Sequence, residues 1–128
     1  MAADSQWSDG VQKGRVRKVH RIGKQLIGCA GNLDETTLFL AWCRQGCEGK
    51  PPKIPNFSAL VLNAKGLFHC VGNDILMPVE SGVHAIGTGG MAAMCTYEAL
   101  GFVSPRLAVA LVCKHDAGSR GPVRVYRL

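Results

Sequence analysis

The sequence has 128 residues, 47% of them apolar, and its 15 lysines and arginines outnumber its 9 aspartates and glutamates to give a net charge of +6. A compact fold of this length removes roughly two thirds of the unfolded chain's surface from water, which suffices for a core without metal or disulfide. This composition argues against a two-domain architecture, and we expect one globular domain over residues 1–128.

No segment of the sequence is suited to crossing a membrane. The longest uncharged stretch, residues 81–97, contains four glycines and a histidine, and it is shorter than the roughly 20 apolar residues of a membrane helix. The first six residues lack the basic and apolar regions of a secretory signal. We therefore expect a cytoplasmic protein with no membrane partner.

The cysteines and histidines do not show the spacing of a metal site. The cysteines are spread along the chain without a C-x-x-C pair, and most lie in apolar runs: Cys29, Cys43, Cys47, Cys70, Cys95 and Cys113. The histidines show no ligand spacing either: His20, His69, His84 and His115. Buried, reduced thiols are favoured over disulfides or zinc, and no metal or cofactor is expected.

Two β-hairpins are predicted. Each consists of two strand-like runs around a short turn, with strands at residues 16–22 and 25–30 in the first hairpin and at 58–63 and 67–71 in the second. The first turn, Gly23-Lys24, has the length and the glycine that a tight hairpin needs.

A helix is predicted over residues 34–45. Asn32 can cap its N-terminus with Glu35 as the returning partner, and Gly46 is a stop signal. The helix is amphipathic, and the residues expected on its packing face are Leu38, Trp42 and Gln45. Residues 47–55 contain three prolines and are predicted to form an irregular surface connection.

The last third of the chain is predicted to contain two helices and a strand. Thr88 and Ser104 can cap helices over residues 89–100 and 105–114, and residues 123–126 alternate like a strand. Hairpins followed by two helices and a last strand predict an antiparallel α+β domain.

Six basic residues lie within twelve positions: Lys13, Arg15, Arg17, Lys18, Arg21 and Lys24. Such a cluster can bind nucleic acid, but only Trp7 supplies a nearby aromatic ring for base stacking. If residues 16–22 form a strand, Lys18 shares a face with Val16 and Ile22, where burial can lower the pKa of an amine. Two interpretations stay open, namely a catalytic lysine and an edge strand protected by positive charge.

Two glycine-rich loops could contribute to a site. Gly87-Thr88-Gly89-Gly90 precedes a predicted helix, so its backbone N–H groups could hold an anion or an oxyanion. A capped turn has the same composition. Residues 115–121 place Asp116 and Ser119 in a loop that, by composition, is only a turn.

Five short motifs follow one another along the chain: Ala2-Ala3-Asp4-Ser5, Gly14-Arg15-Val16-Arg17-Lys18-Val19, Ile27-Gly28-Cys29-Ala30-Gly31, Ala85-Ile86-Gly87-Thr88-Gly89-Gly90 and Asp116-Ala117-Gly118-Ser119-Arg120-Gly121. Taken in this order they resemble proteasome β-type subunits and the bacterial heat-shock-locus peptidase. The length and the short proline-rich connection are closest to the small proteasome-like proteins of bacteria and phages. The resemblance covers nearly the whole chain.

The resemblance implies the N-terminal nucleophile hydrolase fold, a four-layer αββα sandwich with two antiparallel sheets between helical layers. Because the connection after the first helix is short, the second helix of that layer is expected to be absent. The family's first strand, which carries the nucleophile, is also expected to be missing.

The chemistry that the resemblance implies is peptide hydrolysis by a threonine at the mature N-terminus, whose own amino group accepts the hydroxyl proton. Asp4 matches the acid beside this nucleophile. Lys18 matches the active-site lysine, and the resemblance therefore favours the catalytic interpretation of Lys18.

The other implied site residues lie in the two glycine-rich loops. Thr88 takes the place of the family's serine in the oxyanion loop, with Gly87 and Gly89 beside it. Asp116 and Ser119 match the acid and the hydroxyl that support the terminal amine.

No threonine or serine precedes Asp4, so the 128-residue chain is expected to lack the nucleophile and to be inactive by itself. One hypothesis is a threonine-type peptidase whose nucleophile strand lies upstream of Met1. The other is a non-catalytic structural or ring-forming subunit. The implied partners are a peptide or protein substrate, further copies of the chain in a ring or dimer, and an ATP-dependent unfoldase, with no nucleic acid.

Overall fold

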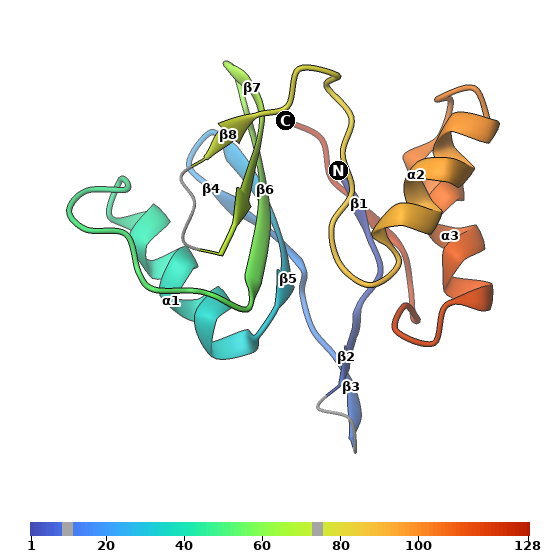
Figure 1. Ribbon diagram of the computed structural model, residues 1–128, viewed down its shortest axis with the longest axis horizontal. Helices are drawn as coiled ribbons and strands as arrows, with labels where there is room; N and C mark the ends of the chain where they lie inside the picture. Colours follow the sequence, from blue (N-terminus) through green and yellow to red (C-terminus); the bar gives the residue numbers. More distant parts are fainter. Residues whose placement is uncertain (9–11, 73–75) are drawn as a thin grey trace. The chain divides into compact units, whose positions relative to one another are not determined.

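The computed structural model describes residues 1–8, 12–72 and 76–128. These residues form two compact units (Figure 1). The first unit consists of residues 1–19 and 85–127, and the second of residues 20–84 with Leu128. No helix in the described ranges is long and apolar enough to cross a membrane.

A five-stranded sheet is the main element of the second unit. Its strands lie side by side in chain order: β4 (Val19–Ile22), β5 (Gln25–Gly31), β6 (Phe57–Asn63), β7 (Gly66–Val71) and β8 (Met77–Pro78). The register places Ile27 opposite Val61 and Val61 opposite Phe68. Both predicted hairpins are confirmed, because short turns at Gly23-Lys24 and Ala64-Lys65 require antiparallel neighbours.

Helix α1 (Leu33–Arg44) begins as predicted, because the Asn32 side chain accepts hydrogen bonds from the first free backbone N–H groups. The helix ends as predicted too, with Gly46 just beyond it at φ +81°. The expected return of Glu35 to the cap is wrong. The Glu35 carboxylate instead accepts a hydrogen bond of 2.9 Å from the backbone N–H of Asn56, so it joins the helix start to the entry of β6.

The packing face of α1 agrees with the prediction at Trp42, which packs against the core, and differs from it at Leu38 and Gln45, which are exposed. Leu38 is 52% exposed, whereas Phe39, Leu40 and Cys43 are buried. On the buried side, the Phe39 ring packs against Phe57 of β6, with centroids 4.9 Å apart and the ring planes tilted by 44°. The core of this unit comprises Ile27, Cys29, Phe39, Leu40, Cys43, Ile54, Phe57, Ala59, Val61 and Cys70.

The thiols follow the prediction in part. All six cysteines are free, and Cys29, Cys43 and Cys70 are buried. Desolvation first, and then the neighbouring thiols, raises the pKa of Cys29 and Cys43 to about 12. Cys95 is exposed, so the expectation of burial is wrong for that residue.

The first unit is built from short strands and two helices. Its elements are β1 (Ala2–Ala3), β2 (Gln6–Ser8), β3 (Lys13–Arg15), α2 (Gly90–Ala99), α3 (Pro105–His115) and β9 (Arg124–Val125). Strand β1 pairs with β9, and β2 with β3, both antiparallel. The helices α2 and α3 pack against each other, and α3 also contacts β1 (Figure 1). The predicted cap of α3 is confirmed, since the Ser104 hydroxyl accepts from the backbone N–H of Leu107 at 3.2 Å.

Two local predictions in this unit are wrong. The strand expected over residues 16–22 begins only at Val19, so Lys18 precedes the strand ladder. Thr88 does not cap α2: Gly89 occupies that position without a side-chain hydrogen bond. The Thr88 hydroxyl instead donates to Asp116 Oδ2 at 3.4 Å.

Three helices and antiparallel strand pairings confirm the predicted α+β class. The helices lie within two residues of their predicted bounds, and the last strand is shorter than predicted. Residues 45–56 contain turns and bends but no helix, in agreement with the expected shortened helical layer. Residues 9–11 and 73–75 lie outside the described residues.

Candidate active site

Asp4 lies in the turn between β1 and β2 and accepts hydrogen bonds from three parts of the first unit. Its Oδ1 accepts from Lys18 Nζ at 2.8 Å. Its Oδ2 accepts from the backbone N–H of Gln6 at 3.1 Å and of Arg120 at 3.2 Å. The Asp4 side chain is only 10% exposed. Its charge-assisted hydrogen bonds are therefore largely shielded from water, and they hold the carboxylate in place.

Lys18 differs from the rest of the basic cluster. Its side chain is 24% exposed and forms an ion pair with Asp4, whereas the other five basic residues of the cluster are exposed: Lys13, Arg15, Arg17, Arg21 and Lys24. Lys18 thus points to a carboxylate rather than to solvent. Lys18 precedes β4, so the alternation of side chains along a strand does not explain why its side chain points inward.

Asp116 is the second carboxylate of the site and follows the last turn of α3. Its Oδ2 accepts a short hydrogen bond of 2.6 Å from the Ser119 hydroxyl and a longer one from the Thr88 hydroxyl. The pKa of Asp116 is lowered, first of all by the hydrogen bond from Ser119. Burial acts in the opposite direction. Hydrogen bonds from the Gly118 backbone and from Thr88, and then the Lys18 charge, lower the pKa further. The effect of the Lys18 charge is the smallest of these contributions.

Two glycines allow the loops of the site to approach each other. A Cβ atom on Gly89 would lie 2.8 Å from both Ser119 Oγ and Val112 Cγ1. A Cβ atom on Gly118 would collide with the Thr88 hydroxyl. The close contact between residues 88–89 and 116–119 therefore requires residues without side chains.

All five predicted side chains lie in the first unit. They form two groups, the Asp4–Lys18 ion pair and the Asp116 carboxylate with its two hydroxyl donors. Gly87, at φ +89°, accepts a hydrogen bond from the backbone N–H of Gly90 at 3.0 Å and so shapes the turn before α2.

Two residues of this region were not singled out from the sequence. The Gln6 amide donates to the carbonyl of Ala117 at 3.0 Å, which joins β2 to the Asp116 loop. Cys113 lies on α3 one turn before Asp116, a spacing that could have identified it. Burial first, and then the charge of Asp4, raises the pKa of the Cys113 thiol, with Lys18 opposing.

The arrangement can hold and polarise a reacting group without a metal ligand set. The described residues contain no cluster of three or more histidine, cysteine or acidic side chains that could bind a metal ion. A lysine fixed by Asp4 supplies positive charge, and Asp116 supplies a negative charge that favours a nearby ammonium group. The Thr88 and Ser119 hydroxyls both donate to Asp116.

No protein-family model matches this sequence, and no curated protein sequence matches it significantly. Solved structures do match. HslV from Trypanosoma brucei is 20% identical with a TM-score of 0.77, over 96% of this chain and 88% of that one. BPH from Thiobacillus denitrificans, solved in complex with epoxomicin, is 17% identical with a TM-score of 0.72 over the same shares.

A third structural match is Anbu, the ancestral β-subunit, from Yersinia bercovieri. It is 13% identical with a TM-score of 0.66, over 95% of this chain and 73% of that one. The chain therefore has the fold of HslV and of proteasome-like N-terminal nucleophile peptidases. This finding confirms the fold that the motif order implied.

Proposed function

We propose that this chain is a proteasome-like, threonine-type peptidase subunit that hydrolyses peptide bonds when a terminal threonine is joined to it. The observation that carries this proposal is the ion pair of 2.8 Å between Lys18 and Asp4. The resemblance to proteasome subunits gives these same residues an active-site role. The structural matches support the fold on which that role depends.

In this proposal the threonine hydroxyl attacks the peptide carbonyl and the threonine's own amine takes its proton. The Lys18 cation lowers the pKa of that hydroxyl, and Asp4 keeps Lys18 in position. Asp116, with Ser119, holds the terminal amine. The Thr88 loop provides backbone N–H groups for the oxyanion of the tetrahedral intermediate.

Neither hydroxyl of the cluster suits the role of nucleophile. Thr88 and Ser119 both donate to Asp116, and neither carries a terminal amine to act as its base. In this proposal the attacking threonine is supplied by a segment joined ahead of Met1, and residues 1–128 alone are expected to be inactive. The substrate class is peptides or unfolded proteins, delivered by an ATP-dependent unfoldase to a ring or dimer of this chain.

A non-catalytic structural subunit is the second candidate function. The observation in its favour is that the Asp4 carboxylate accepts hydrogen bonds from three segments of the first unit, at Lys18, Gln6 and Arg120. A satisfied network of this kind also stabilises folds that do no chemistry. In that case the cluster would hold the end of β1, the segment that precedes β4 and the loop after α3 together.

The test compares the 128-residue chain with a version extended by one strand that begins Met-Thr. We expect turnover of a fluorogenic peptide only in the extended version, with the terminal Thr→Ala variant as control. Lys18→Ala in the extended version should lower turnover by about 10²-fold or more. Turnover by the 128-residue chain or by the alanine control would contradict the terminal-threonine mechanism. A folded, inactive extended version would favour the structural candidate.

A further inference from the structure

Two histidines of the second unit lie next to each other, outside the candidate active site. His69 is on β7, and His84 follows β8 at the end of the chain segment that forms this unit. Their ring centroids are 4.3 Å apart, with the ring planes tilted by 49°. His69 is half-buried and His84 is exposed. Two imidazole rings are therefore held together at a place that an ion can reach from solvent.

Short hydrogen bonds fix the segment that carries His84. The backbone N–H of Val79 donates to the carbonyl of Leu67 at 2.8 Å, which ties this segment to β7. The Ser81 hydroxyl donates to the carbonyl of Val83 at 2.8 Å, one residue before the histidine. The two rings are thus brought together by the backbone before any ligand binds. A preorganised pair loses little conformational freedom when a ligand joins it.

The Ser58 hydroxyl of β6 lies beside the His69 ring, with its Oγ 3.4 Å from Nε2. When this hydroxyl accepts a hydrogen bond from Nε2–H, the lone pair of the ring is on Nδ1. Histidines that bind metal ions usually donate their other N–H to such an oxygen. Burial first, and then the charge of His84, lowers the pKa of His69. The His69 ring therefore offers an uncharged nitrogen donor at neutral pH.

We propose that His69 and His84 form a binding site for a divalent transition-metal ion, with the two imidazole nitrogens as protein ligands and water at the other positions. Imidazole suits Zn²⁺, Ni²⁺ and Cu²⁺, whereas Mg²⁺ and Ca²⁺ take oxygen ligands. Metal–nitrogen bonds are about 2.0–2.1 Å long, so two rings at this separation can share one ion. Among the described residues, no third histidine, cysteine or acidic side chain joins the pair in a metal-binding group. The affinity of the site therefore depends on both rings.

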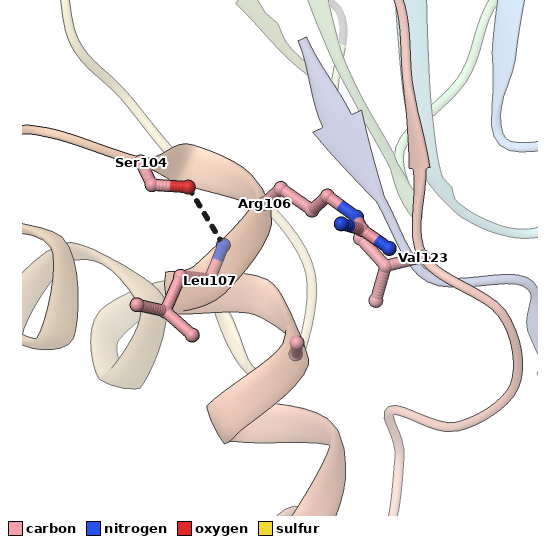
Figure 2. A pocket seen from close by; sticks show the side chains of 5 residues that line it. Ser104, Arg106, Leu107 and Val123 are labelled. Atoms are coloured by element: carbon pink, nitrogen blue, oxygen red, sulfur yellow. Dashed lines mark hydrogen bonds between the residues drawn. The ribbon is translucent and has the colours of Figure 1, made fainter.

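A groove on α3 does not compete for such an ion. It has a volume of about 350 Å³ and is lined by Ser104, Arg106, Leu107, Ala110 and Val123. Figure 2 shows the Arg106 side chain extending toward Val123, and the Ser104 hydroxyl bonded to the backbone N–H of Leu107. A guanidinium group is positively charged and has no lone pair for a metal ion. The groove therefore disfavours a cation, unlike the histidine pair.

The first test titrates the whole 128-residue chain with Ni²⁺ at neutral pH in a calorimeter. We expect one Ni²⁺ ion per chain and weaker binding of Co²⁺, in the usual order of affinities of these ions. His69→Gln and His84→Gln should each lower the affinity about tenfold or more, because even the loss of an outer partner of a ligating histidine costs about that much. The double variant should lose little more than either single variant, since one ion needs both rings.

Two control variants remove other accessible ligands. His115→Gln removes an exposed imidazole of α3, and Cys95→Ser removes an exposed thiol of α2. Both should bind Ni²⁺ as tightly as the unchanged chain. Because His84 is exposed, His84→Gln should keep the circular dichroism spectrum of the folded chain. A loss of affinity in either control, or single variants that keep the affinity at reduced stoichiometry as independent histidines would, overturns the proposal.

The second test needs no substitution and is independent of peptidase activity. Paramagnetic Ni²⁺ broadens the NMR signals of the groups that bind it. On addition of less than one equivalent, the imidazole C–H signals of His69 and His84 should broaden together, while those of His115 persist. A chelator should restore the signals, and excess Mg²⁺ should leave the broadening unchanged. Broadening of one ring of the pair alone, earlier broadening of His115, or no binding of Ni²⁺ would overturn the proposal.

Discussion

Lys18 Nζ lies 2.8 Å from Asp4 Oδ1, and the same carboxylate binds the backbone N–H of Arg120, which is 116 residues away in sequence. One acidic side chain thus joins the first strand, the segment before β4 and the loop after α3. The pair therefore has two roles open to measurement, one in the stability of the first unit and one in the proposed chemistry.

Removal of Asp4 should cost more stability than removal of Lys18. Asp4→Ala leaves two backbone N–H groups and one cation without their acceptor, and we expect a loss of about 3 kcal/mol. Lys18→Met leaves a carboxylate with two remaining donors, and partial exposure of Lys18 screens the pair, so we expect about 1 kcal/mol. Urea unfolding midpoints measure both. Equal losses, or a larger loss for Lys18→Met, would contradict this ranking.

The Asp116 carboxyl should titrate below its ordinary pKa of 3.8. Because the folded-state pKa is the lower one, the stabilisation is present above pH 3.8 and is lost as the pH falls through the folded-state pKa. Ser119→Ala should raise this pKa most, and Thr88→Val should raise it less because its hydrogen bond is longer.

Carbon-detected NMR of the Asp116 carboxyl group measures this titration in each variant. A larger effect of Thr88→Val than of Ser119→Ala would be inconsistent with the geometry.

The His69 and His84 rings should make the second unit sensitive to acid. Their centroids are 4.3 Å apart, and burial first, and then the positive charge of His84, lowers the pKa of His69 below 6.5. The unfolded state then binds a proton more readily, so stability is intact above about pH 6.5 and declines as the pH falls below it.

NMR titration of the imidazole C–H groups should show His69 titrating at lower pH than a free histidine, and His84→Gln should raise its pKa. The facing Ser58 hydroxyl lies 3.4 Å from His69 Nε2, so Ser58→Ala serves as the comparison that alters the surroundings without removing a charge. An unchanged His69 pKa in His84→Gln would refute the electrostatic contribution of the pair.

Ser5→Ala should stabilise the chain. Ser5 is 5% exposed, and its hydroxyl has no hydrogen-bond partner among the described residues. Replacing such a buried group should raise the free energy of unfolding by about 1 kcal/mol. Ser119→Ala is the matched control, because it removes a hydroxyl that is bonded at 2.6 Å and should lower stability. A loss of stability in both variants would show that the Ser5 hydroxyl is satisfied in solution.

The sequence by itself determined the elements whose signals are local. The turn at Gly23-Lys24, the caps at Asn32 and Ser104, and the stop at Gly46 are each formed by residues within a few positions of one another. Their hydrogen bonds do not depend on the rest of the fold, so turn and cap chemistry predicts them well. The motif order that resembles proteasome subunits likewise predicted the fold that the structural matches show.

Only the tertiary structure decided which hydrogen-bond partners Thr88, Glu35 and Lys18 have. Thr88 and Glu35 could each have taken part in capping a neighbouring helix, yet Thr88 donates to Asp116 and Glu35 accepts from Asn56. Lys18 is directed inward by Asp4, not by strand alternation. A local hydrogen bond and a long-range one differ little in net energy, so packing between distant segments selects the pairing. The same reason explains why Phe39 rather than Leu38 faces the core of the second unit.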